Sequence, residues 1–215
     1  MEITNIVIVD DENLFRELLY RTLSNEQGLK IIGQAEDGES AVRITEEMKP
    51  DVVLMDIELP GEMNGIEAAL QIKKKRPDTG IVILSSHSDR RYMTSLPLDN
   101  FYGWAYLLKQ TVPDIATVVR AIHGSKNGMV VMDPDIVNKM QPKRGSIWAN
   151  MTSRQQEVLK LIAQGHNNAA IADILKLSEK SVETYINVIY QELGLSHEPG
   201  IHARVMATIH YLQSC

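Results

Sequence analysis

The sequence predicts an α/β domain with a doubly wound, five-stranded parallel sheet, followed by an all-α domain. Two observations predict this fold class. In the first 128 residues, short runs of β-branched and large apolar residues alternate with amphipathic segments, which is typical of strands buried on both faces of a parallel sheet. From residue 151 onward, the apolar residues follow helical spacing. Strand–helix units joined by right-handed crossovers place helices on both faces of the sheet.

Strands and helices are expected to alternate along the first domain. Pro97 is expected to interrupt the fourth helix, because proline lacks a backbone N–H and clashes with the preceding turn. Two other helices are each expected to carry one apolar face, formed by Leu14, Phe15, Leu18, Leu19 and Leu23 in the first and by Ile66, Ala69, Leu70 and Ile72 in the second. The expected strands are Ile6–Val9, Lys30–Gly33, Val52–Asp56, Ile81–Ser85 and Ala105–Leu108.

The two domains are expected to be joined by a linker at residues 129–150. This stretch contains two prolines, a glycine and no sustained periodicity, although Asp135–Met140 could form a short helix. The expected boundaries are therefore residues 1–128 for the α/β domain and 151–215 for the helical domain.

Composition narrows the class of protein. A hydrophobic content of 44% with 23% charged residues is ordinary for a globular chain, and no apolar run reaches the roughly 18 residues that a membrane span needs. Acidic residues near the N-terminus argue against a signal peptide, and the single cysteine, Cys215, fits a reducing compartment. We expect a cytoplasmic protein. The net charge of −6 argues against a polybasic nucleic-acid coat but leaves room for a small DNA-reading surface.

Polar residues stand where the expected strands end. Asp10 and Asp11 follow the first strand, Asp56 ends the third, Ser85 ends the fourth and Lys109 follows the fifth. In doubly wound sheets, ligands bind at the carboxyl ends of the strands. Clustered carboxylates favour a hard cation such as Mg²⁺, and a lysine with a hydroxyl can stabilise a phosphoryl group, so the pattern predicts a phosphoryl-accepting site. Taken singly, each aspartate could instead cap a loop.

This pattern resembles the receiver domain of two-component response regulators, which has a flavodoxin-like fold. The resemblance implies that Asp56 accepts the phosphoryl group. It also implies that Mg²⁺ is bound by Asp11, Asp56 and the backbone carbonyl of Glu58, with Asp10 assisting through water. The residues that carry the resemblance are IVIVDDENLFR, DVVLMDIELPG with the following NGIEA, IVILSSHSD and AYLLK.

The same resemblance assigns roles to three further residues. Ser85 would bond a phosphoryl oxygen, and Lys109 would neutralise its charge. Tyr106 matches the aromatic switch that turns inward after phosphorylation, although it could also simply fill the sheet. Glu62 resembles a one-residue insertion in the loop after Asp56.

The second domain begins with a helix signal. Thr152 and Gln155 have the spacing of a capping box, and apolar residues continue at helical spacing to Gly165. A short helix is expected at Asn168–Lys176. After a tight turn, a third helix carries an apolar stripe. These helices fit a helix-turn-helix or a generic helical bundle equally well. The stripe comprises Val182, Ile186, Ile189 and Leu193.

The stretch TSRQQEVLKLIAQGHNNAAIADILKLSEKSVETYINVIYQELGLS resembles the LuxR-type DNA-binding domain of NarL-like response regulators. The resemblance implies that Glu179–Leu193 enters the major groove of promoter DNA. It also implies that Ile201–Leu212 makes the contact of a homodimer on two half-sites. The residues that would face bases or nearby phosphates are Lys180, Glu183, Thr184 and Asn187. Ser181 and Tyr185 would lie on the side of the DNA backbone.

Together the two resemblances predict a transcriptional regulator, not an enzyme, that is switched by phosphorylation from a sensor histidine kinase or a small donor such as acetyl phosphate. Two alternatives stay open. Glu183 and the acidic end of the same helix favour a protein-interaction regulator that binds DNA weakly. Asp56 with Glu58 could alternatively belong to a phosphatase with an aspartyl nucleophile.

The run from Lys73 to Arg76 is explained by favourable charge at a helix C-terminus and by solvation, or by contact with a partner or a phosphate.

Overall fold

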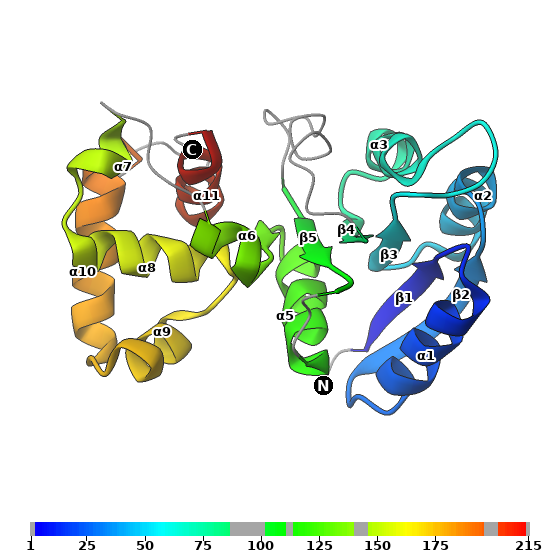
Figure 1. The fold of residues 1–215 in the computed structure, drawn as a ribbon, viewed down its shortest axis with the longest axis horizontal. Helices are drawn as coiled ribbons and strands as arrows, with labels where there is room; N and C mark the ends of the chain where they lie inside the picture. The colour runs from blue at the N-terminus through cyan, green and yellow to red at the C-terminus, as the bar shows by residue number, and fades with distance from the viewer. Residues whose placement is uncertain (1–2, 87–101, 111–113, 140–145, 196–201, 214–215) are drawn as a thin grey trace. The chain divides into compact units, whose positions relative to one another are not determined.

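The computed structural model describes residues 3–86, 102–110, 114–139, 146–195 and 202–213. The chain divides into two compact units, Met1–Met129 and Val130–Cys215 (Figure 1). The fourth helix and the effect of Pro97 fall at positions outside the described residues.

Among the described residues, a six-stranded sheet forms the centre of the α/β fold, with strand order β2-β1-β3-β4-β5-β6. The pairs β1–β2, β1–β3, β3–β4 and β4–β5 are parallel. The predicted number of five strands is therefore wrong by one, because β6 has two residues and is too short to show a period of its own. The strands are β1 (Thr4–Val9), β2 (Leu29–Ala35), β3 (Val52–Asp56), β4 (Gly80–Ser85), β5 (Trp104–Leu108) and β6 (Val131–Met132).

Helices cover both faces of this sheet, which confirms the doubly wound architecture. Helices α1 (Asn13–Ser24) and α5 (Ile115–Lys126) contact each other on one face (Figure 1). Helices α2 (Gly38–Met48) and α3 (Gly65–Lys75) pack together on the other. The central strands are buried on both sides, as the continuous apolar runs predict.

The apolar face expected on α1 is only half buried. Leu19 and Leu23 are buried, whereas Leu14 is 85% exposed and Leu18 is 57% exposed. At about 100° per residue, these leucines spread over roughly half of the helix circumference. The sheet covers the part centred on Leu19 and Leu23, and the other two leucines lie outside it.

The second unit is helical beyond β6. Its two short helices, α6 (Pro134–Lys139) and α7 (Ile147–Asn150), lie in the stretch expected to be a linker. Val137 and Trp148 are buried, the Tyr211 hydroxyl donates a 3.0 Å hydrogen bond to the carbonyl of Val137, and the rings of Trp148 and Tyr211 lie 4.5 Å apart. These contacts tie α6 and α7 to the core of this unit. The remaining helices are α8 (Ser153–Ala163), α9 (Asn168–Leu175), α10 (Glu179–Glu192) and α11 (Ala203–Gln213).

Within the part of the chain that the structure describes, every helix is too short or too polar to cross a membrane.

Candidate functional site

The carboxyl ends of four adjacent strands gather the predicted acidic, hydroxyl and basic residues. Asp10 follows β1, and Asp56 is the last residue of β3. Ser85 is the last residue of β4, and Lys109 follows β5. Because these strands are parallel neighbours, their ends lie at one edge of the sheet.

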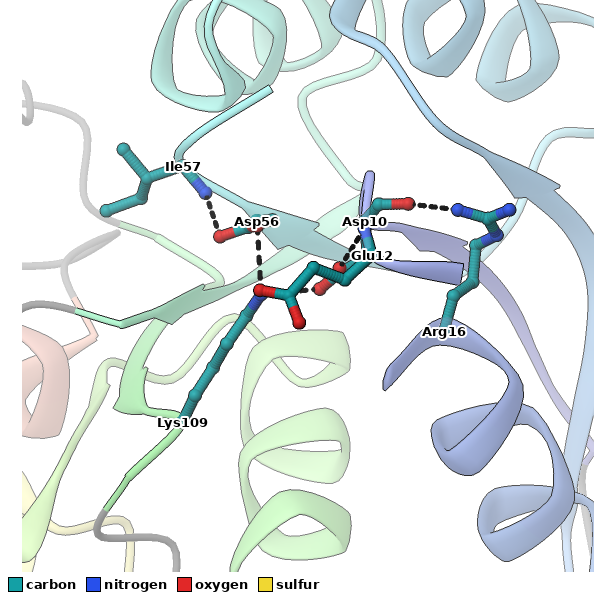
Figure 2. A network of polar contacts seen from close by, with 6 residues as sticks. All are labelled: Asp10, Glu12, Arg16, Asp56, Ile57 and Lys109. Atoms are coloured by element: carbon teal, nitrogen blue, oxygen red, sulfur yellow. Dashed lines mark hydrogen bonds and ion pairs between the residues drawn. The ribbon is translucent and has the colours of Figure 1, made fainter. Parts of the chain in front are cut away.

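Lys109 joins the two buried aspartates (Figure 2). Its Nζ lies 2.7 Å from Oδ2 of Asp10 and donates a 2.9 Å hydrogen bond to Oδ2 of Asp56. The side chains of Lys109, Asp10 and Asp56 are only 8%, 0% and 5% exposed. The ammonium group therefore compensates two carboxylates that water cannot reach freely.

Backbone groups hold the other oxygens of both carboxylates. The N–H of Ile57 donates to Oδ1 of Asp56 at 2.7 Å, and the N–H of Glu12 donates to Oδ1 of Asp10 at 3.0 Å. These bonds fix the orientation of each carboxylate, so one oxygen of each faces Lys109 (Figure 2).

Two residues of α1 support this arrangement, and neither was predicted. The Arg16 guanidinium donates to the backbone carbonyl of Asp10 (Figure 2). The Nζ of Lys109 lies 4.6 Å from the centre of the Phe15 ring, within the range of a cation–π contact. Sequence spacing places both residues one turn or less into α1 but does not show which way they point.

Burial sets the protonation behaviour of the site. It raises the pKa of Asp10 and of Asp56, and the contacts of both groups with Lys109 offset part of that rise. The charge of Asp10 raises the pKa of Asp56 further. Burial alone would lower the pKa of Lys109, but its hydrogen bonds to the two carboxylates and their charges outweigh burial and raise it.

Three carboxylates can present oxygens to one cation. Asp10, Asp11 and Asp56 each offer an oxygen atom, and these atoms lie within 4.8 Å of one another. Asp11 is exposed, while the other two are buried. An all-oxygen donor set with one side open to water suits Mg²⁺, which prefers hard ligands and keeps several waters. The residues present fit that ion. Glu58, expected to contribute its carbonyl, lies two residues past Asp56 and is exposed.

The loop after Asp56 is held by close packing at the start of α3. A Cβ on Gly65 would lie 1.6 Å from the carbonyl oxygen of Asp56, so the helix start approaches this strand end as only glycine permits. Asn64 caps α3 by accepting from the N–H of Ile66 and of Glu67, and Glu67 accepts from the N–H of Asn64 in return. An Asn-Gly pair is a general turn signal in a sequence, but it gives no indication of the contact with Asp56.

Ser85 and Tyr106 lie within the sheet. Ser85 is 2% exposed, and its carbonyl accepts a 2.8 Å hydrogen bond from the N–H of Lys109. Tyr106 is 1% exposed and pairs with Ile83 in the register of β4 and β5. The aromatic residue expected to act as a switch therefore occupies a buried position.

The second unit contains a helix pair with the dimensions of a helix-turn-helix. Helix α9 ends at Leu175, and the next residue, Lys176, adopts a left-handed conformation with φ of 54°. Ser178 caps α10 by accepting from the N–H of Ser181 at 3.1 Å. The apolar stripe of α10 is buried through Val182, Ile186 and Ile189. Its other face is exposed and contains the four residues expected to meet DNA: Lys180, Glu183, Thr184 and Asn187.

Comparison with known families decides the assignment. Residues 6–114 match the family described as response regulator receiver domain, and residues 149–204 match the bacterial regulatory proteins of the luxR family. The chain belongs to the response regulators with a LuxR-type DNA-binding domain. Response regulators of this kind are DNA-binding regulators of transcription and not enzymes.

Individual relatives agree with this assignment. The response regulator is 34% identical over 196 residues to the transcriptional regulatory protein YhcZ of Bacillus subtilis, covering 89% of this chain and 90% of YhcZ. A LuxR-family response regulator from Aurantimonas is 27% identical with a TM-score of 0.55, covering 64% of this chain and 95% of that one. The RcsB response regulator of Salmonella typhimurium is 21% identical over 99% of both chains, with a TM-score of 0.55, and shares the fold.

Proposed function

We propose that this response regulator is switched by transfer of a phosphoryl group to Asp56. The observation that carries the proposal is the position of Asp56 at the sheet edge, where Lys109 and the N–H of Ile57 hold its two oxygens. A carboxylate with fixed orientation beside a cation suits nucleophilic attack on phosphorus. A sensor histidine kinase, or a small donor such as acetyl phosphate, supplies the phosphoryl group.

The acidic cluster is the proposed Mg²⁺ site. Asp10, Asp11 and Asp56 would provide side-chain oxygens, and Glu58 would provide its backbone carbonyl. When bound, the ion neutralises negative charge at the transferring phosphoryl group. By holding this ion, Asp10 and Asp11 would allow a dianionic phosphoryl group to approach a sheet edge that already carries several carboxylates.

Lys109 is the proposed link between chemistry and conformation. Before transfer it pairs with Asp10 and Asp56. A phosphoryl group on Asp56 brings further negative charge that competes for the same ammonium group. Ser85 would donate its hydroxyl to a phosphoryl oxygen, so β4 and β5 both respond to the modification. Tyr106 is three residues before Lys109 on β5 and is the proposed aromatic switch.

The proposed output of the switch is sequence-specific binding of promoter DNA by α10. Lys180, Glu183, Thr184 and Asn187 lie on its exposed face, and Ser181 is half-buried near its start. A cytoplasmic homodimer would place two copies of α10 on two half-sites. The relationship to RcsB, described in connection with DNA interaction, supports this proposal.

Phosphorylation in the test tube checks the proposal. With Mg²⁺ and acetyl phosphate, the wild-type protein should gain one phosphoryl group, which peptide mapping should place on Asp56. Asp56→Ala should abolish the gain. Glu58→Ala should retain it, because the proposed ligand there is a backbone carbonyl. A phosphoryl group on another residue of the wild-type protein would contradict the proposal.

A second candidate output rests on the charge of the recognition helix. Glu183 and Glu192 are exposed on α10, and its single basic residue is Lys180. An acidic surface loses much of the counterion release that drives DNA binding, which favours contact with a protein instead. Footprinting on the DNA upstream of the gene separates the two: protection supports DNA reading, and its absence with phosphorylated protein supports a protein partner.

A further inference from the structure

The basic run at the end of α3 contains one lysine that differs from its neighbours. The Nζ of Lys73 donates hydrogen bonds to the carbonyls of Pro77 at 3.0 Å and Tyr102 at 2.7 Å. Lys74 is exposed, and Lys75 forms an ion pair with Glu46 on α2. Charge at a helix end or solvation accounts for the latter two, but neither accounts for a lysine turned onto two backbone carbonyls.

Lys73 lines a cavity of about 200 Å³ at the amino-terminal edge of the sheet, where β4 and β5 begin. The opposite edge carries Asp56, so this cavity is separate from the phosphorylation site. Gly103 makes room for the amine: a Cβ there would lie 3.0 Å from Nζ of Lys73. The lining consists of Lys73, Pro77, Asp78, Tyr102, Gly103, Ser125, Lys126, Asn127 and Gly128.

The surroundings of Lys73 raise the fraction of its amine that is neutral above that of an exposed lysine. Burial lowers the pKa of Lys73 to about 8, and the charge of Asp78 opposes that shift. The other titratable groups of the lining are Tyr102 and Lys126, and the Nζ of Lys126 lies 3.8 Å from a carboxylate oxygen of Asp51. With a pKa of about 8, roughly a tenth of the amine is neutral at pH 7, against a few parts in ten thousand for an ordinary lysine.

A neutral amine with two N–H groups engaged keeps a lone pair for reaction. The carbonyls of Pro77 and Tyr102 accept both hydrogens that an –NH₂ group carries. A desolvated lysine of this kind is a nucleophile toward carbonyl carbon. The cavity is several times larger than the roughly 30 Å³ that one water occupies in the liquid, so a small acyl group fits beside the amine.

We propose that Lys73 is an acylation site that takes its acyl group from small acyl phosphates. The lone pair of Nζ attacks the carbonyl carbon, an N–C bond forms, and the bond from that carbon to the phosphate oxygen breaks. Inorganic phosphate leaves with the electron pair, and Nζ releases one proton to solvent. Lys126 adds positive charge to the cavity lining, which favours an anionic donor.

The experiment compares lysines within one peptide of the full-length, wild-type protein. Acetyl phosphate is added in the presence of a chelator, so that metal-dependent phosphorylation does not occur. Cleavage at acidic residues then gives a peptide ending before Asp78, and mass spectrometry measures acetylation at each lysine of the run. At pH 7.5, Lys73 should react at least tenfold faster than the exposed Lys74. Its rate should level off above about pH 8.5, because the amine is then largely neutral.

Two further measurements test the class of acyl donor and the effect of the charge of Asp78 on Lys73. Acetyl coenzyme A, a bulkier thioester, should acylate Lys73 more slowly than acetyl phosphate does. Asp78→Asn removes a charge that favours the ammonium form and should raise the rate at Lys73 at pH 7. Equal rates at Lys73 and Lys74, or a rate at Lys73 that still rises in proportion to hydroxide up to pH 10, would overturn the proposal. Faster transfer from the thioester would overturn the assignment of the donor class.

Discussion

Lys109 and Asp10 form a buried ion pair, with Nζ 2.7 Å from Oδ2, and the same ammonium group also holds Asp56. One cation thus restrains two carboxylates that lie at the carboxyl ends of two different strands. In the proposed function, a phosphoryl group on Asp56 would change the charge that Lys109 must compensate, and this relationship would connect the modification to β5.

Removing that cation should destabilise the receiver domain. Lys109→Met keeps much of the side-chain stem but leaves Asp10 and Asp56 buried without a counter-charge, which should cost about 3 kcal/mol of unfolding free energy at pH 7. Added Mg²⁺ should restore part of the loss, because a bound cation replaces the missing charge. Urea denaturation with and without Mg²⁺ measures both effects. An unchanged unfolding free energy of Lys109→Met in metal-free buffer would show that the contacts of Lys109 with Asp10 and Asp56 do not stabilise the site.

Gly65→Ala should disturb the loop that follows Asp56. The added methyl group would meet the carbonyl oxygen of Asp56 at 1.6 Å, so either the strand end or the start of α3 must move. We expect a loss of about 3 kcal/mol, at the upper end of typical overpacking, together with slower phosphorylation. Glu62→Ala, at an exposed position in the same loop, serves as the control and should change stability by less than about 0.5 kcal/mol. Denaturation midpoints and acetyl phosphate kinetics give the two readouts.

Asp37 should make the first unit sensitive to acid through the cap of α2. Its carboxylate accepts from the N–H of Ser40 at 2.7 Å and from the Ser40 hydroxyl at 2.9 Å. The hydrogen bond from the Ser40 N–H is the largest factor that lowers the pKa of Asp37. A lowered folded-state pKa adds stability that is fully present above the unfolded value of about 3.9 and is lost as pH falls through the folded value.

Asp37→Asn isolates this effect, because asparagine caps helices nearly as well without titrating. The difference in unfolding free energy between wild type and Asp37→Asn should shrink as pH is lowered from 6 to 3, with wild type the more stable at pH 6. Thermal or urea unfolding across that range measures it. A difference that does not vary with pH would show that the carboxylate charge contributes nothing to the cap.

DNA binding should depend on Lys180. It is exposed and is the single basic residue of α10, so Lys180→Ala should cost about 1–3 kcal/mol of binding free energy. Lys160→Ala is the matched control, because it removes a lysine from α8 and leaves α10 unchanged. The Nζ of Lys160 lies 5.9 Å from the centre of the Trp148 ring. Fluorescence anisotropy with promoter DNA provides the measurement. Equal losses in both variants would place the DNA on another surface.

Glu183→Lys separates repulsion from readout. If Glu183 only repels phosphate, the substitution should tighten binding to every sequence. If it accepts from a cytosine amino group, the substitution should instead erode preference for the specific site. Comparing affinities for specific and unrelated duplexes distinguishes the cases. An unchanged affinity for both duplexes would mean that Glu183 does not approach DNA.

Much of the site could be predicted because parallel strands end at one edge. Asp10, Asp56 and Lys109 are far apart in sequence, yet strand-end position alone is enough to expect them together. The contacts of Phe15 and Arg16 could not be predicted in this way. They depend on how α1 is rotated against the sheet, and periodicity does not determine that rotation when leucines spread around half of the helix.

Short elements escaped prediction for a different reason. β6 has two residues and α7 has four, which is too few for either to complete the repeats that distinguish strand from helix. Their formation depends on tertiary contacts, as the burial of Trp148 against Tyr211 illustrates. The longer helices α8 and α10 carry caps and apolar stripes in the sequence and were predicted correctly.

The affinity of the regulator for the DNA upstream of its own gene, measured before and after phosphorylation, tests the central claim most directly. Phosphorylation should raise the affinity of the wild-type protein at least tenfold and should leave that of Asp56→Ala unchanged. Equal affinity of the phosphorylated and unphosphorylated wild-type protein would contradict a switch that acts through Asp56.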